Sequence, residues 1–257
     1  ISHPGRDFFA LFADYDNDGF LDLFIINSEA NRLYHNSGEG AFQDITASTG
    51  IETTSEGRTA LFADLDLEGD LDLFITTGTR NRLYRNNLDG TFSEIADEAG
   101  LIGEEFISRD ATFGDFDDDG DIDIFVVNQN GTNRYFDNLR QSYFQDITRH
   151  TNLITDGGSG AVATGDYDND GYIDLFVTAL IGGQHSLLRN RGDGTFERDA
   201  RSEGAFESIK GFAGLDAVFF DADNDGFLDL LVAGESQDET KGHSGLQLFY
   251  NNGGGIY

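Results

Sequence analysis

The sequence predicts an all-β protein, a β-propeller of four-stranded antiparallel blades with five repeats in this chain. An acidic nine-residue loop occurs five times, and the first residues of successive loops lie 50, 51, 51 and 55 residues apart. Each loop is followed by a β-rich apolar run, as in Leu23 to Ile26. A fixed long period indicates a repeat architecture. Because a single small sheet cannot bury its own faces, such sheets stack around an axis.

Each period divides into the same four strands. In the first repeat we expect strands at 8–13 and 21–27, a third at 31–34, and a fourth after a glycine-containing turn. A phenylalanine recurs at one place in the second strand and is expected to pack between neighbouring blades. A β-sandwich is the alternative, but it does not explain why the same loop returns in each period. The phenylalanines are Phe24, Phe74, Phe125 and Phe176.

The repeats predict one domain, 1–257, with blades at about 6–50, 57–101, 108–153, 159–204 and 214–257. The fifth repeat is incomplete, because only six residues follow Asn251 where a fourth strand should run. Either five blades close with an imperfect seam, or further blades lie outside this chain. The start at Ile1 without methionine leads us to expect a processed or excised piece.

The recurring loop reads D-x-D-x-[DE]-G-x-x-D, as in Asp14 to Asp22. Carboxylates at alternate positions converge when the backbone curls around a point, and the glycine permits the sharp turn. Oxygen-only coordination suits a hard cation, and a flexible loop of this size suits Ca²⁺ rather than Mg²⁺. The sequence therefore predicts up to five Ca²⁺ ions, one per repeat.

The predicted ligands are the side chains at loop positions one, three, five and nine and the carbonyl at position seven. The side-chain ligands are Asp14, Asp16, Asp18 and Asp22; Asp64, Asp66, Glu68 and Asp72; Asp115, Asp117, Asp119 and Asp123; Asp166, Asp168, Asp170 and Asp174; and Asp221, Asp223, Asp225 and Asp229. The carbonyl ligands belong to Phe20, Asp70, Asp121, Tyr172 and Phe227.

The loops differ from an EF-hand, which has a bidentate Glu at position twelve and a helix on each side. A solvated Asp-Gly turn is the alternative for any single copy, and five copies with one spacing argue against it. In the second loop Glu68 replaces the usual Asp, and its longer side chain is expected to distort or weaken that site.

The formal net charge is −32, and the loop side chains supply twenty of the 48 acidic residues. Such a surface repels nucleic acid and anionic membranes, so neither is an expected partner. The chain has no cysteine, which excludes disulfides and thiol-ligated metals, and no apolar run long enough to insert into a membrane.

The loops make the chain similar to the FG-GAP and VCBS repeat family, which includes the calcium-bearing blades of the integrin alpha subunit. Arg82 to Asn87 with Asp89 to Phe92 resembles bacterial VCBS proteins and relatives of cartilage acidic protein. This resemblance implies an extracellular propeller, usually of seven blades, with Ca²⁺ between the two innermost strands. The Gly-Ala-Pro element of integrin repeats is missing, and only Phe113-Gly114 matches the other half, which argues against an integrin-like partner.

The loops between second and third strands are the more variable and are the expected recognition surface. His185-Ser186 and His243-Ser244 occupy equivalent loops and could flank a ligand or a metal, although polar loop residues are the simpler interpretation. Arg191-Gly192-Asp193 spells an integrin-recognition tripeptide but occupies the ordinary third-to-fourth-strand turn.

The sequence predicts a calcium-stabilised extracellular binding or adhesion module, or a structural subunit of a surface assembly. Its expected partners are a protein or a glycan at the cell surface, with further copies or domains in an assembly. Two alternatives are a lectin and the propeller part of an enzyme that acts on polysaccharide. No nucleophile elbow, phosphate loop or His-Glu-x-x-His is present, so we expect no enzyme activity.

Overall fold

The computed structural model describes residues 3–53, 57–101, 106–153, 158–180, 183–202, 204–236 and 245–256. Over these residues the chain forms five antiparallel sheets, four of them with four strands and the last with three. In every sheet the strands are hydrogen-bonded in chain order, which is the meander of a propeller blade. The predicted fold class is therefore confirmed.

Each blade runs from a long first strand to a short fourth strand. Blades 1 and 2 comprise β1 (Asp7–Ala13), β2 (Asp22–Asn27), β3 (Arg32–Asn36), β4 (Phe42–Asp44), β5 (Gly57–Ala63), β6 (Asp72–Thr77), β7 (Arg82–Asn86) and β8 (Phe92–Glu94). Blades 3 and 4 comprise β9 (Ser108–Gly114), β10 (Asp123–Asn128), β11 (Arg134–Asn138), β12 (Phe144–Asp146), β13 (Ser159–Gly165), β14 (Asp174–Ala179), β15 (Ser186–Asn190) and β16 (Phe196–Arg198). Blade 5 comprises β17 (Phe212–Phe220), β18 (Asp229–Ser236) and β19 (Gly245–Phe249).

Short helical segments follow the fourth strands. They are α1 (Thr46–Thr49), η1 (Thr148–His150), η2 (Ala200–Ser202) and η3 (Ala205–Ile209).

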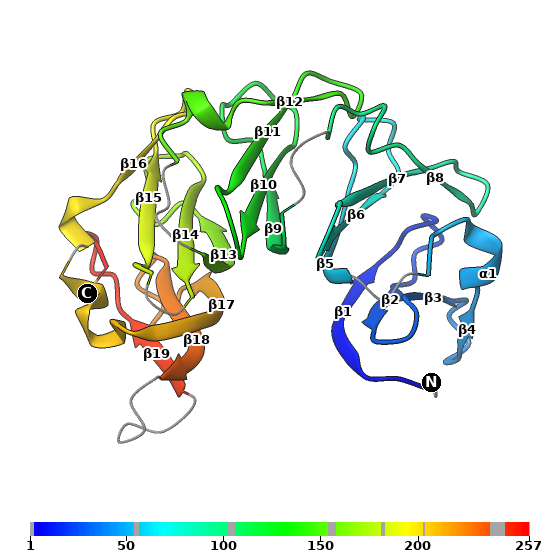
Figure 1. Ribbon diagram of the computed structural model, residues 1–257, viewed down its shortest axis with the longest axis horizontal. Coiled ribbons are helices and arrows are strands. Elements are labelled where there is room, and N and C mark those ends of the chain that lie inside the picture. Colours follow the sequence, from blue (N-terminus) through cyan, green and yellow to red (C-terminus); the bar gives the residue numbers. More distant parts are fainter. Residues whose placement is uncertain are drawn as a thin grey trace.

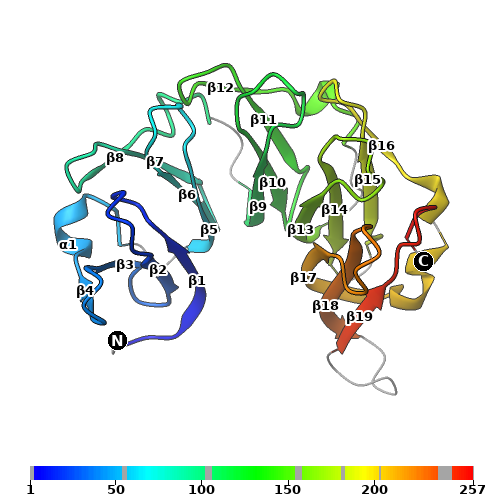
Figure 2. The same ribbon diagram turned by 180° about the vertical axis from the view of Figure 1, so that it is seen from behind.

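The blades follow one another around a common axis as an arc (Figure 1, and from behind in Figure 2). The first strands β1, β5, β9, β13 and β17 lie innermost, and each contacts the first strand of the next blade. An axial cavity of about 300 Å³ is lined by first-strand residues from all five blades, including Phe9, Arg58, Asp110, Gly160 and Asp216.

Four of the core clusters of the described residues each lie between two consecutive blades, and a smaller fifth cluster lies within blade 1. The phenylalanine at the third residue of the second strand packs towards the following blade, as Phe24 and Phe74 show. All four of these phenylalanines are at most 1% exposed, so the prediction that they pack between blades is confirmed. The residue before each phenylalanine packs towards the preceding blade, as Leu73 does. Alternation along β2 and its counterparts thus joins successive blades.

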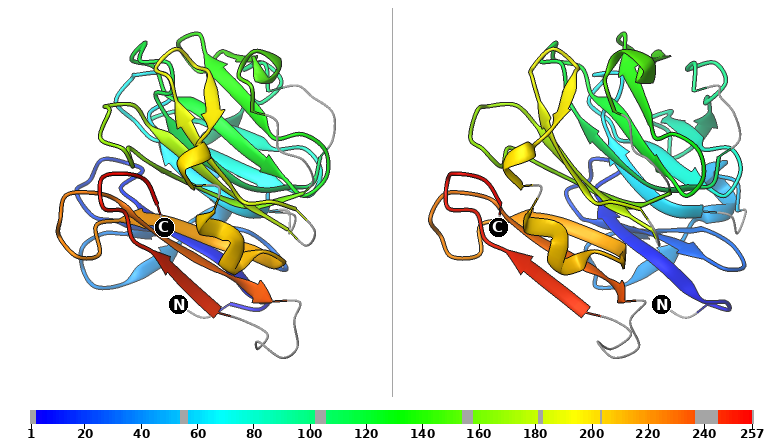
Figure 3. Two further views of the ribbon diagram at one scale, coloured as in Figure 1. Left: turned by 90° about the vertical axis from the view of Figure 1, so that its left-hand side faces the viewer. Right: turned by 60° about the vertical axis from the view of Figure 1, so that its left-hand side comes forward.

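Each of the two end blades exposes a face whose equivalent is buried in the inner blades. Phe12 of β1 is 55% exposed, whereas its counterpart Phe62 packs against blade 1. At the other end Leu248 of β19 is 39% exposed, whereas its counterpart Leu33 is fully buried. Figure 3 shows both end blades, blue and orange-red, on the same side of the molecule.

Blade 5 begins the pairing of a fourth strand. Asn251 forms a bridge with Ile256, as Asn36 pairs with Phe42 where β3 meets β4. Over the described residues this sheet has three strands, in agreement with the incomplete fifth repeat seen in the sequence.

Asparagines at the ends of the third strands join neighbouring blades. Asn190 Nδ2 donates to the carbonyl of Ile173 at 3.0 Å within blade 4 and to that of Phe116 at 2.8 Å in the loop of blade 3. Asn86, Asn138 and Asn251 make the same pair of bonds. Asn36, in the first blade, bonds the carbonyl of Leu21 within its own blade. Blades 2 to 5 are therefore each tied to the acidic loop of the preceding blade.

Replacing Asn190 with alanine should lower the free energy of unfolding by about 2–4 kcal/mol, because one buried and one partly buried carbonyl lose their donor. Urea unfolding followed by circular dichroism measures this change. Asn36→Ala is the matched control, since it removes only exposed bonds within blade 1, to the carbonyl of Leu21 and from the N–H of Gly38, and should cost under about 1 kcal/mol. Equal losses in the two variants would contradict an inter-blade role.

Candidate metal centres

The acidic loops share one backbone conformation that curls the chain. The fourth residue of every loop has φ between 57° and 63°, and the glycine at position six has φ between 89° and 94°. Asn, Asp and Gly tolerate this left-handed region, and Asn or Asp occupies position four in four of the loops. Leu67 is the exception, and it makes the second loop the most strained of the five.

Two carboxylates in each loop hold the curl together. Asp14 Oδ2 accepts the backbone N–H of Gly19 at 2.9 Å, and the first Asp of each other loop accepts the same bond. The ninth residue is buried and bonds in two directions. Asp174 accepts the N–H of Tyr167 in its loop at 3.2 Å and the N–H of Asn190 at the end of β15 at 2.8 Å. The ninth Asp therefore attaches the loop to the same asparagine that ties the blades together.

Carboxylate oxygens from different residues of one loop lie close together. In each of several sets of three residues, one oxygen from each residue lies within 4.8 Å of the other two. They include Asp14, Asp16 and Asp18; Asp64, Asp66 and Asp70; Asp115, Asp117 and Asp119; and Asp166, Asp168 and Asp174.

Several of these oxygens are buried without a hydrogen-bond donor. They are Oδ1 of Asp64, Asp70, Asp117 and Asp168. Buried polar atoms are normally paired, and an unpaired one calls for an explanation such as an ion. The residues present thus fit a bound hard cation.

The second loop adds a side chain to the candidate ligands. The carboxylate of Asp70, at position seven, forms a close set with those of Asp64 and Asp66. Asp70 is 3% exposed, so its side chain faces the interior of the site. The equivalent Asp121 is also buried, and its carboxylate pairs with Arg140 at 3.2 Å.

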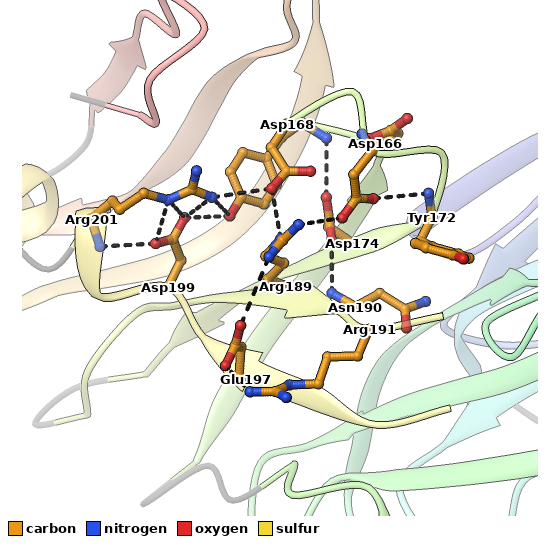
Figure 4. Close-up of polar contacts among 12 residues, drawn as sticks. Asp166, Asp168, Tyr172, Asp174, Arg189, Asn190, Arg191, Glu197, Asp199 and Arg201 are labelled. Atoms are coloured by element: carbon orange, nitrogen blue, oxygen red, sulfur yellow. Dashed lines mark hydrogen bonds and ion pairs between the residues drawn. The ribbon is translucent and has the colours of Figure 1, made fainter. Parts of the chain in front are cut away.

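We call Asn86, Asn138, Asn190 and Asn251 the linking asparagines, because each bonds the preceding blade. The residue before the asparagine at this position gives the metal sites different local charges. In blade 4 Arg189 pairs with Asp168 at 2.7 Å and with Asp170 at 2.6 Å (Figure 4). Arg201 also reaches Asp168, at 3.1 Å. In blade 2 Arg85 lies 3.7 Å from Asp66. The same place holds His35 in blade 1, 3.1 Å from Asp22.

In blade 3 the same place holds a carboxylate, Asp137, whose pKa is raised by burial and by the charges of Asp119 and Asp121. The third site therefore has an additional negative charge where the fourth has a cation.

Burial raises the pKa of the ninth residue to about 7 at Asp72 and Asp123 and to about 8 at Asp174. The nearby loop carboxylates raise these pKa values further, and the N–H bonds partly oppose the rise. Burial likewise raises the pKa of Asp117 to about 6. Without a cation, these loops are costly to ionise.

The structure assigns local roles to two other motifs from the sequence. His185 is buried; its Nδ1 accepts the N–H of Ala179 and its Nε2 lies 3.2 Å from the carbonyl of Phe212, so it joins blades 4 and 5. His243 and Ser244 lie outside the described residues. In the Arg191-Gly192-Asp193 tripeptide, Asp193 accepts the N–H and hydroxyl of Thr195 within the turn.

The axial cavity contains a second group of charges. Arg58 and Arg109 line it with Asp110 and Asp216. Asp110 accepts the N–H of Val162 at 3.0 Å, which links blade 3 to blade 4. This carboxylate therefore takes part in holding the blades together.

The repeated antiparallel sheets, each with an acidic loop between its first two strands, define a β-propeller built from acidic-loop repeats. A family model described as "FG-GAP-like repeat" matches residues 14–75, 64–126 and 115–177. These matches span more than half of the chain, and the chain belongs to the FG-GAP-like repeat family. No curated protein matches the sequence.

Solved structures share the fold at low identity. A lectin from Agrocybe aegerita is 21% identical with a TM-score of 0.63 over 97% of this chain and 64% of the lectin chain. The V. cholerae biofilm matrix protein Bap1 is 14% identical with a TM-score of 0.51 over 96% of this chain and 38% of that protein. The Dos1 propeller is 13% identical with a TM-score of 0.51 over 90% of this chain and 53% of that one. This chain spans less than two thirds of each.

Among the described residues no helix is long and apolar enough to cross a membrane.

The raised pKa values predict that the metal-free protein loses stability as pH rises. An unfolded Asp titrates near pH 4. Asp72, Asp123 and Asp174 keep their protons in the folded state until about pH 7 to 8. Between these limits the folded state binds more protons, so the free energy of unfolding falls with increasing pH.

Urea unfolding in chelator at pH 5 and pH 8 measures this fall. Asp174→Asn should reduce the slope, because the amide does not titrate. A slope that is absent or of opposite sign would refute the assignment.

Proposed function

We propose that this protein is a calcium-stabilised extracellular β-propeller that serves as a binding module or as a structural part of a surface assembly. The observation that carries the proposal is the set of buried carboxylate oxygens without donors, which recur in loops of one conformation. Oxygen-only donors on a short flexible loop suit Ca²⁺.

In this proposal the ion would neutralise the carboxylates at positions one, three, five and nine. Position seven would add its carbonyl or, in blade 2, the side chain of Asp70. The stabilisation would spread because the ninth Asp also holds the linking asparagine, which bonds the preceding loop. One ordered loop would thus support two blades.

A binding role fits the scaffold better than catalysis. The loop carboxylates shape the loops, and Asp110 at the axis accepts backbone N–H groups. Loops on a rigid scaffold commonly carry recognition. The Agrocybe aegerita protein is described as recognising non-reducing terminal N-acetylglucosamine, and Bap1 as a biofilm matrix protein. A glycan or protein at the cell surface is the partner class that we propose for this chain.

Removing calcium should lower the melting temperature by more than about 10 °C, because each ion contributes about 2.7 kcal/mol at a hundredfold excess over its Kd. Differential scanning calorimetry with and without EDTA measures this, and added Mg²⁺ tests the choice of ion. Asp117→Ala should remove one ion of the total counted by elemental analysis. A melt unchanged by EDTA would refute the calcium proposal.

The strand-three residues predict opposite effects on calcium affinity. Asp137→Ala should weaken the third site about fivefold to tenfold, because a nearby negative charge is lost. Arg189→Ala should strengthen the fourth site by a similar factor, since Asp168 and Asp170 lose a competing cation. Competition titration against a fluorescent chelator measures both affinities.

Arg191→Ala is the matched control, because Arg191 pairs with Glu197 rather than with a loop carboxylate. If Arg191→Ala changed the affinity as much as Arg189→Ala does, only net charge would matter.

A further inference from the structure

A cavity of about 360 Å³ lies at the junction of blades 4 and 5. It is open to solvent on one side and is lined by residues of β15, the end of β16 and the helical segments η2 and η3, which are the gold turns beside blade 4 in Figure 1. Its buried apolar wall includes Leu187 and Phe206. Its exposed polar rim includes Gln184, Glu207 and Lys210.

This junction differs from the others in sequence. After the fourth strand, blades 1 to 3 have an isoleucine whose N–H donates to the third strand, as Ile147 does to Tyr135. In blade 4 the same bond, to Leu187, comes from Asp199. The carboxylate of Asp199 is held by the hydroxyl of Tyr167 and by Arg201 (Figure 4). The position that is isoleucine in blades 1 to 3 is thus polar in blade 4.

The connection to blade 5 is also longer. The last loop spacing is 55 residues against 50 or 51 for the others, and η3 lies in this longer connection. Phe206 of η3 packs on Phe176 and Phe249, with ring centroids 5.0 and 5.4 Å apart, so the segment is anchored to both blades. The cavity therefore has a rigid wall that the repeat itself does not require.

One wall of the cavity carries an unpaired hydroxyl. Ser202 is fully buried, and its Oγ has no hydrogen-bond partner. Its counterpart in blade 1 is Ser48, since the N–H of each bonds the carbonyl three residues before it. Ser48 Oγ donates to the carbonyl of Ile45 at 2.7 Å. A buried hydroxyl without a partner is costly, and a polar atom of a ligand would satisfy it.

We infer that this cavity binds one neutral, hydroxyl-rich ring, such as the terminal monosaccharide of a glycan. The inference deepens the proposed binding function and rests on it. The volume is at the lower end for ligand sites, which suits a single ring. The apolar wall suits the C–H face of a pyranose, while the amide, carboxylate and ammonium groups of the rim suit its hydroxyls. Lys210 pairs with Glu207 at 3.1 Å. The charges of the other two ionised lining residues, Arg198 and Asp199, are opposite, so the lining has no net charge to select an ion.

Titration of the folded chain with free sugars tests the inference. The probes are methyl glycosides of neutral hexoses, 6-deoxyhexoses and N-acetylhexosamines, with glucuronate, glutamate and glycerol for comparison. Saturation-transfer NMR detects binding and isothermal calorimetry measures its affinity. We expect at least one neutral glycoside to bind at millimolar concentration.

Ser202→Ala should weaken that binding about tenfold, because the ligand loses a buried hydrogen bond. Its melting temperature should stay unchanged or rise, since an unpaired hydroxyl is removed. Gln184→Ala, at an exposed rim position, should weaken binding without affecting folding. Ser48→Ala, the matched control in blade 1, should leave the affinity unchanged.

Three results would overturn the inference: no glycoside binds, only glucuronate or glutamate binds, or Ser202→Ala and Ser48→Ala bind alike. The calcium-dependent melt of the same variants reports on the scaffold separately. A cavity that fails to bind sugar therefore leaves the calcium proposal standing, and a failed calcium test does not depend on the sugar titration.

Discussion

Mutual repulsion of carboxylates at short range is the constraint on which this molecule depends. The loops gather aspartates around one point, and the ninth residue of each loop is buried, where water screens its charge less. Burial is the main cause of the raised pKa values of Asp72, Asp123 and Asp174, and repulsion by the nearby carboxylates raises them further. Backbone N–H groups stabilise part of the charge, yet several oxygens remain without a donor. A hard cation is the chemical species that would satisfy what the hydrogen bonds leave.

The same carboxylates connect the loops to the architecture. Asp174 bonds Asn190, and Asn190 bonds a carbonyl in the preceding loop. A second link comes from position four, where Asn17 Nδ2 donates to the carbonyl of Gly69 at 3.0 Å in the next loop. Neighbouring loops therefore share hydrogen bonds, and any ion that orders one loop acts on the blades beside it.

Repetition leaves room for specialisation where the repeat does not need a particular residue. The position before the asparagine that ends the third strand is His35, Arg85, Asp137 or Arg189, because that side chain reaches the loop without entering the core. The segment after the fourth strand is free to change in blade 4, where Asp199 and η3 build a cavity. These positions can thus vary without a change in the scaffold.

The sequence by itself determined the repeat, the strand order, the acidic loops and the inter-blade phenylalanines. These are local or periodic properties. Apolar and polar residues alternate along each strand, a turn occurs at each glycine, and the whole pattern returns after each period. The asparagine that recurs at the end of each third strand is also visible in the sequence, but its role is not.

Only the tertiary structure decided which atoms those asparagines bond, since Asn190 and the carbonyl of Phe116 are 74 residues apart in sequence. It likewise brought the side chain of Asp70 into the second cluster, placed Arg189 against two candidate ligands, and left Ser202 unpaired beside a cavity. Such outcomes depend on side-chain directions and on contacts between blades. A sequence period places residues in equivalent positions, but packing against the neighbouring blade decides what each one touches.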